Sequence, residues 1–218
     1  MTPNEAPDTE DEEIDTELVE EMLFGKPKPK RRKAGKKKAK SKAAASLYTL
    51  RIELMDIMPA IWRRVVVQGD STLGDLHDVI QNVMGWHNGH LHQFIVEDSD
   101  ETYSDPEFGL EGSGDEFGVS LAGVLPEVKS TLIYQYDFGD NWEHLVTVEK
   151  IEPMKGSRGG YPVCLDGARA CPPEDCGSIP GYDELCKAMK NKKHKRRAEL
   201  LDWLGEEYDP EAFDLEEI

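Results

Sequence analysis

The stretch from residue 47 to residue 98 constrains the fold most, because two strand patterns, a capped helix and a third strand follow one another within it. LYTLRIELMDI alternates apolar and polar residues, and IWRRVVV repeats the β-branched signal after a turn at Met58-Pro59. LHQFIVED, after the helix, predicts the third strand. This order favours an α+β roll of the β-grasp type, in which the helix crosses one face of the sheet.

The helix in this stretch has recognisable ends. Ser71 or Thr72 can serve as its N-cap, Asp75 places an acidic group in the first turn, and Gly85 suits its C-terminal end. The apolar side chains recur at helical spacing on one face: Leu73, Leu76, Ile80, Val83 and Met84. We expect this face to pack on the sheet.

A second hairpin and a helical end complete the domain. STLIYQYDF and WEHLVTVEKI predict two strands that turn at Gly139-Asp140-Asn141, after a polar, Gly-rich excursion over residues 98–118. GYDELCKAMK and HKRRAELLDWLGE predict helices. The expected fold class is α+β, with a β-grasp- or roll-like mixed sheet, a crossing helix and a helical C-terminal part.

Charge separates the first residues of the chain from the rest. Residues 1–25 are acidic, and residues 26–42 hold 11 Lys and Arg side chains. Blocks of like charge cannot bury a core. We therefore expect a disordered tail over residues 1–45, acidic and then rich in Lys and Arg, and a single domain over residues 46–218.

The basic block has two interpretations. It can be an arm that binds nucleic acid or another polyanion, or a linker whose charge the preceding acidic stretch partly neutralises. Beyond residue 42 the chain carries 15 basic and 34 acidic side chains, so that part repels a nucleic-acid backbone. The candidate nucleic-acid contacts of the arm are Lys30, Arg31, Arg32, Lys33, Lys36, Lys37 and Lys38.

The sequence has no run of about 18 apolar residues that would predict a membrane span, and no apolar segment follows a basic one at the N-terminus, as it would in a secretory signal. We expect no membrane association and a cytoplasmic location. Because the cytosol keeps thiols reduced, clustered cysteines there act more often as ligands or buried thiols than as disulfides.

Three of the four cysteines, Cys164, Cys171 and Cys176, lie within thirteen residues of a run rich in Gly, Pro and Asp. Structural zinc takes four ligands, usually Cys and His, often in pairs about two to four residues apart. The spacing here is looser, so Cys186 or a distant histidine would have to complete a zinc site. Buried reduced thiols are an equally good interpretation, and disulfide or redox chemistry is a third.

Two further motifs offer ligands or acid–base groups. His90 and His92 are two apart in an extended segment, so both side chains can reach one ion from the same face; the alternative is a pair of solvated or core-edge histidines. Asp137, Asp140 and His144 lie around the second hairpin turn, where they could bind a divalent ion or act as catalytic groups. Aspartate is also common at turns because it bonds its own backbone.

The motifs, taken in order, resemble a known family. LRIELMDIMPAIWRRVVV, TLGDLHDVIQNVMGW with GHLHQF, YDFGDNWEH, YPVCLDGARACPPEDCGSIPGY and WLGEEYDPEAFD are together similar to the plasmid pRiA4b ORF-3-like family, over about residues 46–215. The resemblance implies an α+β fold, occurrence in bacteria and archaea near plasmids and mobile elements, and no established biochemical role. Some relatives carry names of transposon resolvase passengers, which imply no mechanism.

Several enzyme templates are absent, because the sequence has no GxxxxGK[ST], no GxGxxG after a strand, no HExxH and no GxSxG. We therefore favour a cytosolic, non-enzymatic binding domain in which a Cys/His cluster, through zinc, stabilises a loop over residues 152–180. A nucleic-acid-associated protein that binds through the basic arm is one rival. The other is a metal-dependent hydrolase of phosphodiesters or similar substrates that uses His90, His92, Asp137, Asp140 and His144.

Overall fold

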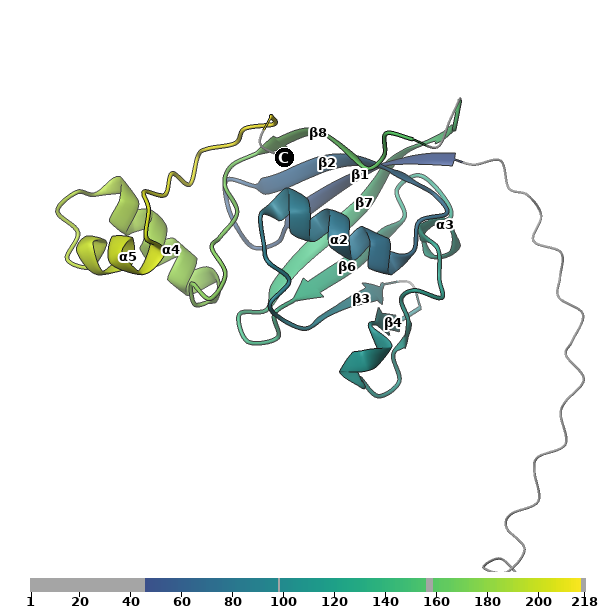
Figure 1. Ribbon diagram of the computed structural model, residues 1–218, viewed down its shortest axis with the longest axis horizontal. Helices are drawn as coiled ribbons and strands as arrows, with labels where there is room; N and C mark the ends of the chain where they lie inside the picture. The colour runs from purple at the N-terminus through teal and green to yellow at the C-terminus, as the bar shows by residue number, and fades with distance from the viewer. Residues whose placement is uncertain (1–45, 98, 156–158, 217–218) are drawn as a thin grey trace, which may run out of the picture. The chain divides into compact units, whose positions relative to one another are not determined.

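A computed structural model of the chain describes residues 46–97, 99–155 and 159–216, all within the unit that spans residues 42–218. The described residues form one eight-stranded sheet in the order β5-β4-β3-β6-β7-β1-β2-β8 (Figure 1). The strands are β1 (Ser46–Leu54), β2 (Ile61–Gln68), β3 (His92–Val96), β4 (Glu101–Ser104), β5 (Gly114–Asp115), β6 (Thr131–Tyr136), β7 (Trp142–Pro153) and β8 (Val163–Ala168). Neighbouring strands are antiparallel except β4 and β5.

Two hairpins form the middle of the sheet. β1 pairs with β2 and β6 pairs with β7, and β7 joins the two hairpins because it also pairs with β1. β3 lies beyond β6, with His92 opposite Tyr136. Because these strands are antiparallel, the α2–β3 loop (residues 86–91) and the β6–β7 turn (residues 137–141) lie at the same end of the sheet.

Helix α2 (Leu73–Met84) lies over one face of the sheet (Figure 1). Thr72 and Asp75 form a reciprocal capping box: the Thr72 hydroxyl accepts from the backbone N–H of Asp75 at 3.0 Å, and the Asp75 carboxylate accepts from that of Thr72 at 2.7 Å. Gly85 ends the helix in the left-handed conformation, at φ 77°. The expected caps of this helix, with Thr72 as the N-cap, are confirmed.

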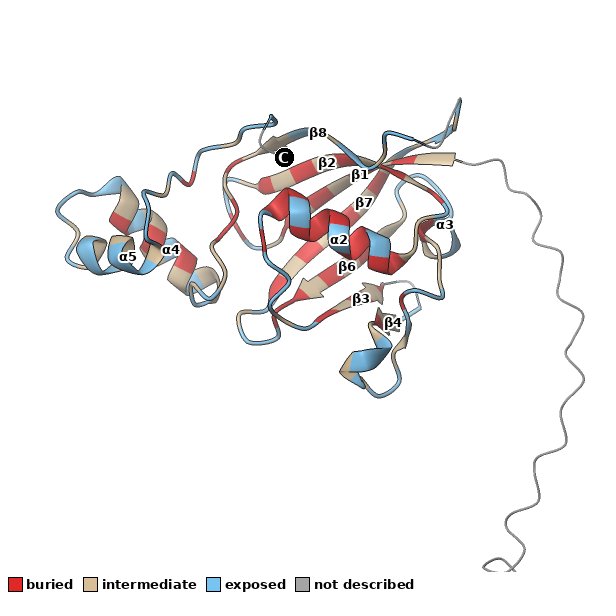
Figure 2. Cartoon of the chain, in the orientation of Figure 1, coloured by how far each residue is buried: buried red, intermediate tan, exposed pale blue. Residues whose placement is uncertain are grey.

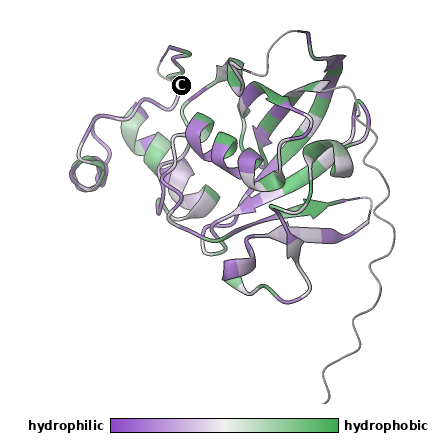
Figure 3. Cartoon of the chain, turned by 45° about the vertical axis from the view of Figure 1, so that its right-hand side comes forward, coloured by the Kyte–Doolittle hydropathy of each residue, from purple (hydrophilic) through white to green (hydrophobic). Residues whose placement is uncertain are grey.

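The core lies between α2 and the sheet. The five central strands, β1, β2, β3, β6 and β7, bury alternate residues along most of their length, which appears as alternating bands in Figure 2, and Figure 3 shows the matching bands of hydropathy. Leu50 and Ile52 of β1 are fully buried, as are Leu73 and Ile80 of α2. The alternation decides which side chains at the strand ends face the core and which face solvent.

Two segments expected to be loops contain short strands. The excursion over residues 98–118 holds β4, one 3-10 turn (η1, Pro106–Phe108) and β5. The segment over residues 152–180 holds β8, which pairs with β2. Because β2 and β8 are far apart in the sequence, no local sequence pattern predicts that they pair.

The remaining helices are α3 (Leu121–Val124), α4 (Ser178–Lys190) and α5 (Arg197–Leu204). The last two form the helical C-terminal part that the sequence predicts. The α+β class, with a mixed sheet and a crossing helix, is therefore confirmed. Across the described residues, every helix is too short or too polar to pass through a bilayer.

The capping box predicts a stability effect. Thr72→Ala removes the side-chain acceptor, so the free energy of unfolding should fall by about 1 kcal/mol in urea denaturation. Thr72→Ser keeps the hydroxyl and should retain most of the wild-type stability. An equal loss in both variants would show that the cap does not hold the start of α2.

Candidate functional site

Segments that are far apart in the sequence meet at one end of the sheet. Trp86, in the α2–β3 loop, donates from Nε1 to the carbonyl oxygen of Pro172 at 2.8 Å. The backbone N–H of His87 donates to Glu174 Oε2 at 3.0 Å. These bonds attach the α2–β3 loop to the cysteine segment (residues 171–177).

The β6–β7 turn joins the same junction. The backbone N–H of Gly177 donates to Asp140 Oδ2 at 3.0 Å. At the end of β6, the Tyr136 hydroxyl donates to the Glu174 carboxylate and accepts from the backbone N–H of Gly89 at 2.9 Å. Three segments are thus held together by hydrogen bonds that need no bound ligand.

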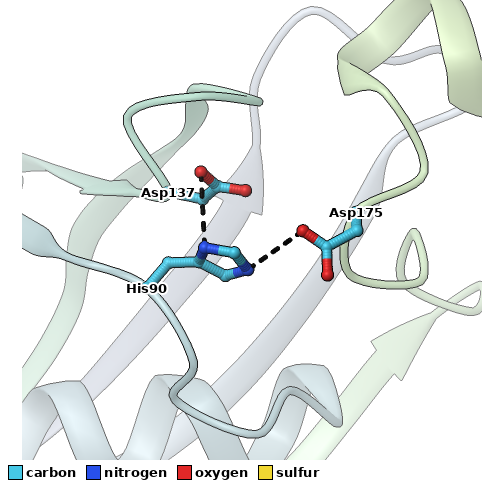
Figure 4. Close-up of side chains that lie close together, drawn as sticks. All are labelled: His90, Asp137 and Asp175. Carbon is cyan, nitrogen blue, oxygen red and sulfur yellow. Dashed lines mark ion pairs between the residues drawn. The ribbon is translucent and has the colours of Figure 1, made fainter.

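His90, Asp137 and Asp175 place one side chain from each segment in a single group (Figure 4). His90 Nδ1 lies 3.7 Å from Asp137 Oδ1, and His90 Nε2 lies 3.3 Å from Asp175 Oδ1. The exposed fraction of the side chain is 11% for Asp137 and 71% for Asp175, so the group opens to solvent on the Asp175 side. We call these residues the His–Asp–Asp group.

The three residues of this group are close enough together to be candidate metal ligands. One candidate ligand atom from each residue lies within 4.8 Å of the other two, and in the described part of the chain no other group of three His, Cys, Asp or Glu does so. An imidazole with two carboxylates is a donor set that suits zinc, manganese or iron. Three protein donors also leave coordination positions open.

Turn geometry positions both aspartates. Asp137 and Asp175 have φ of 55° and 59°, in the left-handed region that aspartate tolerates better than most residues. Asp137 Oδ1 accepts from the backbone N–H of Gly139 at 2.9 Å, and the backbone N–H of Asp137 donates to Leu91 O at 2.9 Å. The turn role expected for Asp137 and a ligand role are therefore compatible.

Cys171, one of the four candidate zinc-ligating cysteines, is buried away from the His–Asp–Asp group. Cys171 Sγ lies 3.1 Å from Met84 Sδ and 3.4 Å from Arg63 Nη2. Burial raises the pKa of Cys171 to about 11. The thiolate that binds metals or attacks substrates is therefore disfavoured at this position.

The other cysteines also remain outside the His–Asp–Asp group. Cys164 lies on β8, Cys176 in the cysteine segment and Cys186 on α4, and all three are half-buried free thiols. Burial raises the pKa of Cys176 to about 12. The geometry favours the buried-thiol interpretation, and zinc binding by the cysteines stays a prediction.

The second candidate histidine, His92, faces the core. Its Nε2 lies 2.9 Å from Glu116 Oε2, within hydrogen-bond distance, and both residues are at most 2% exposed. His144 is completely buried. Of the five residues in the hydrolase hypothesis, only His90 and Asp137 belong to a group of three ligand atoms in the described residues.

A closed circuit of hydrogen bonds lies between α2 and β6. Gln81 Nε2 donates to the Tyr134 hydroxyl at 3.0 Å, and that hydroxyl lies 2.8 Å from His77 Nδ1. His77 Nε2 lies 2.9 Å from Asn88 Oδ1, and the backbone N–H of Asn88 returns to Gln81 Oε1 at 2.8 Å. We call this arrangement the His77 circuit.

The protonation of His77 agrees with its circuit. Burial, followed by the neighbouring imidazole of His92, lowers the pKa of His77 to about 4. A neutral imidazole has one donor and one acceptor. Since the Asn88 oxygen can only accept, Nε2 carries the proton and Nδ1 accepts from Tyr134.

Sequence reasoning missed Asp175 and Glu116. Asp175 had one signal, its place within the cysteine run, but aspartate there also suits a turn. Glu116 lies in the polar excursion, where nothing marks it for burial. The basic candidates from Lys30 to Lys38 lie outside the described residues, so nucleic-acid binding through them stays a prediction.

Comparison with known proteins gives the family. The model of the plasmid pRiA4b ORF-3-like proteins matches residues 46–217. The chain belongs to this family. A family relative, "Uncharacterized protein y4hQ" of Sinorhizobium fredii, is 38% identical over 176 residues, which cover 80% of this chain and 89% of the relative.

A solved structure of similar fold supports the same assignment. The crystal structure of "Protein of Unknown Function MM3350" from Methanosarcina mazei Go1 matches this chain with a TM-score of 0.71 and 34% sequence identity. The match covers 80% of this chain and 98% of that one. This chain therefore shares its fold with that protein, while its association with plasmids and mobile elements stays a prediction.

Burial of His144 predicts a dependence of stability on pH. Desolvation lowers the pKa of His144 from 6.5 to about 4. Between these values the unfolded chain binds a proton that the folded chain does not, so stability falls as the pH falls through this window. At about 1.4 kcal/mol per pKa unit, the total loss is on the order of 3 kcal/mol.

The variant His144→Phe keeps a buried ring and removes this titration. Urea denaturation at pH 7 and at a pH near 4.5 should show that the variant loses about 2 kcal/mol less stability than the wild type between the two conditions. Equal losses in the two proteins would contradict a buried neutral His144.

Proposed function

We propose that this protein binds a divalent transition-metal ion through His90, Asp137 and Asp175, and that the ion fixes the cysteine segment to the end of the sheet. The convergence of three ligand atoms from three separate segments carries this proposal. The domain would then present a metal-dependent surface to a binding partner. The proposed function is therefore still a metal-stabilised binding domain, as the sequence suggests. The proposed ligands are the His–Asp–Asp group and not the cysteines.

Charge supports a cation at this position. Two carboxylates lie on either side of one imidazole, and the Glu174 and Asp140 carboxylates lie in the same junction. A divalent ion would offset the repulsion among these acidic groups. Calcium and magnesium prefer sites made of oxygen ligands, whereas the imidazole favours zinc, and the two carboxylates also suit manganese.

The surrounding groups favour binding over hydrolysis. A metal-dependent hydrolase needs a base beside the bound water. Glu174 already accepts from the Tyr136 hydroxyl and the His87 backbone, and Asp140 accepts from the Gly177 backbone. Both carboxylates therefore already take part in the hydrogen bonds that hold the cysteine segment in place.

Metal titration tests the proposal. Isothermal titration of the chelator-treated full chain with Zn²⁺ and Mn²⁺ should show one site for at least one ion. Asp175→Asn replaces a charged ligand with a neutral side chain of the same shape. Loss of a residue that only supports a metal ligand weakens metal binding about 10–100-fold, so loss of a ligand should weaken it at least as much. The matched control is Asp202→Asn, an exposed aspartate on α5, which should bind as the wild type does.

A cysteine variant separates the two possible ligand sets. Cys176→Ser should leave the affinity unchanged, because Cys176 lies outside the His–Asp–Asp group. The proposal fails if the wild type binds less than about a tenth of an equivalent of either ion. It also fails if Cys176→Ser abolishes binding while Asp175→Asn does not.

A further inference from the structure

A cavity of about 550 Å³ lies beside the His–Asp–Asp group. The start of α2, the end of the α2–β3 loop and the segment from η1 to Phe117 form its walls. His90 lines it as well, so one residue borders both the cavity and the proposed metal position. A volume of this size accommodates a small molecule.

The charge of the walls selects the kind of ligand. Asp78, Asp105 and Glu116 line the cavity, and of the described residues around it none is Lys or Arg. An anion would meet three acidic side chains and neither Lys nor Arg, so phosphates and carboxylates are disfavoured. A phosphodiester is therefore a poor candidate for this cavity.

Two aromatic rings give the cavity an apolar wall. Phe108 and Phe117 both line it, and Phe117 is 56% exposed. The Phe117 ring lies directly on Gly74, where an added Cβ would come within 2.3 Å of it. Packing on this glycine holds an exposed aromatic face at the cavity, and such a face attracts cations.

One residue of the cavity wall, His92, has an unpartnered polar atom. His92 is 2% exposed, and its Nε2 lies 2.9 Å from Glu116 Oε2. Its Nδ1 has no hydrogen-bond partner among the described residues. The His92 ring stacks on His77 at a centroid distance of 3.6 Å. With both His77 nitrogens in use, His77 cannot satisfy this atom. His92 Nδ1 is therefore a buried polar atom that no described residue satisfies.

We propose that this cavity binds a small organic cation that carries an ammonium or guanidinium group. The carboxylates supply the opposite charge, and the Phe rings supply cation–π contacts. A compact metal ion is the wrong occupant, because no three ligand atoms of the described cavity residues come as close together as in the His–Asp–Asp group. The proposal is independent of the metal site.

Three four-carbon molecules of equal length test the charge requirement. The full chain, treated with chelator so that no amine can coordinate a bound ion, is titrated with putrescine, 1,4-butanediol and succinate, and binding is followed by the ring-proton NMR signals of His77 and His92. Putrescine should give saturable shifts, and the neutral and anionic analogues should give none at concentrations up to about 10 mM. Methylguanidine and tetramethylammonium extend the set of cations.

Variants assign the binding to this cavity. Asp78→Asn is an exposed change on α2, and Asp105→Asn keeps the oxygen that caps η1. Each should weaken putrescine binding about tenfold, as loss of one charge-assisted contact predicts. Asp175→Asn should leave putrescine binding unchanged while it weakens metal binding, so the two proposals fail separately.

Two outcomes would overturn the organic-cation site. One is a failure of the charge requirement: none of putrescine, methylguanidine and tetramethylammonium gives saturable shifts, or succinate binds as tightly as putrescine. The other is unchanged putrescine affinity in both Asp78→Asn and Asp105→Asn, which would place binding on another acidic surface of the chain.

Discussion

The His77 circuit is the interaction on which the candidate site depends. Buried polar groups that lack partners cost free energy, so His77, Gln81 and Tyr134 can lie between α2 and the sheet only if each finds a partner. Asn88 completes the set, with both its side chain and its backbone. This fixes the α2–β3 loop against the core. The loop then places His90 beside the aspartates of the other two segments.

Features set by local sequence could be predicted. The helix follows from Thr72, Asp75 and Gly85, whose capping roles depend on near neighbours, and the hairpins follow from alternation and turn residues. β8 could not be predicted, because its pairing with β2 depends on a remote partner. The burial of Cys171 was also hidden, since its contacts with Met84 and Arg63 arise only in the folded chain.

The site could be predicted only in part for the same reason. His90 and Asp137 were candidates on residue type and turn position, and the structure brings them together. Asp175 was not, because nothing in the cysteine segment shows that its turn reaches His90. His92 has the spacing of a ligand, yet its position at the start of β3 directs it to the buried Glu116. The spacing of residues along the chain can predict metal ligands only where all of them lie in one helix, strand or turn.

A metal-bound crystal structure tests the account most directly. Crystals soaked with Mn²⁺ or Zn²⁺ are measured at the absorption edge of the metal, so that the anomalous signal locates the ion. We expect one strong peak about 2.0–2.2 Å from a nitrogen of His90 and from carboxylate oxygens of Asp137 and Asp175. A peak at the cysteine thiols, or a fully formed junction with no peak at His90, would contradict it.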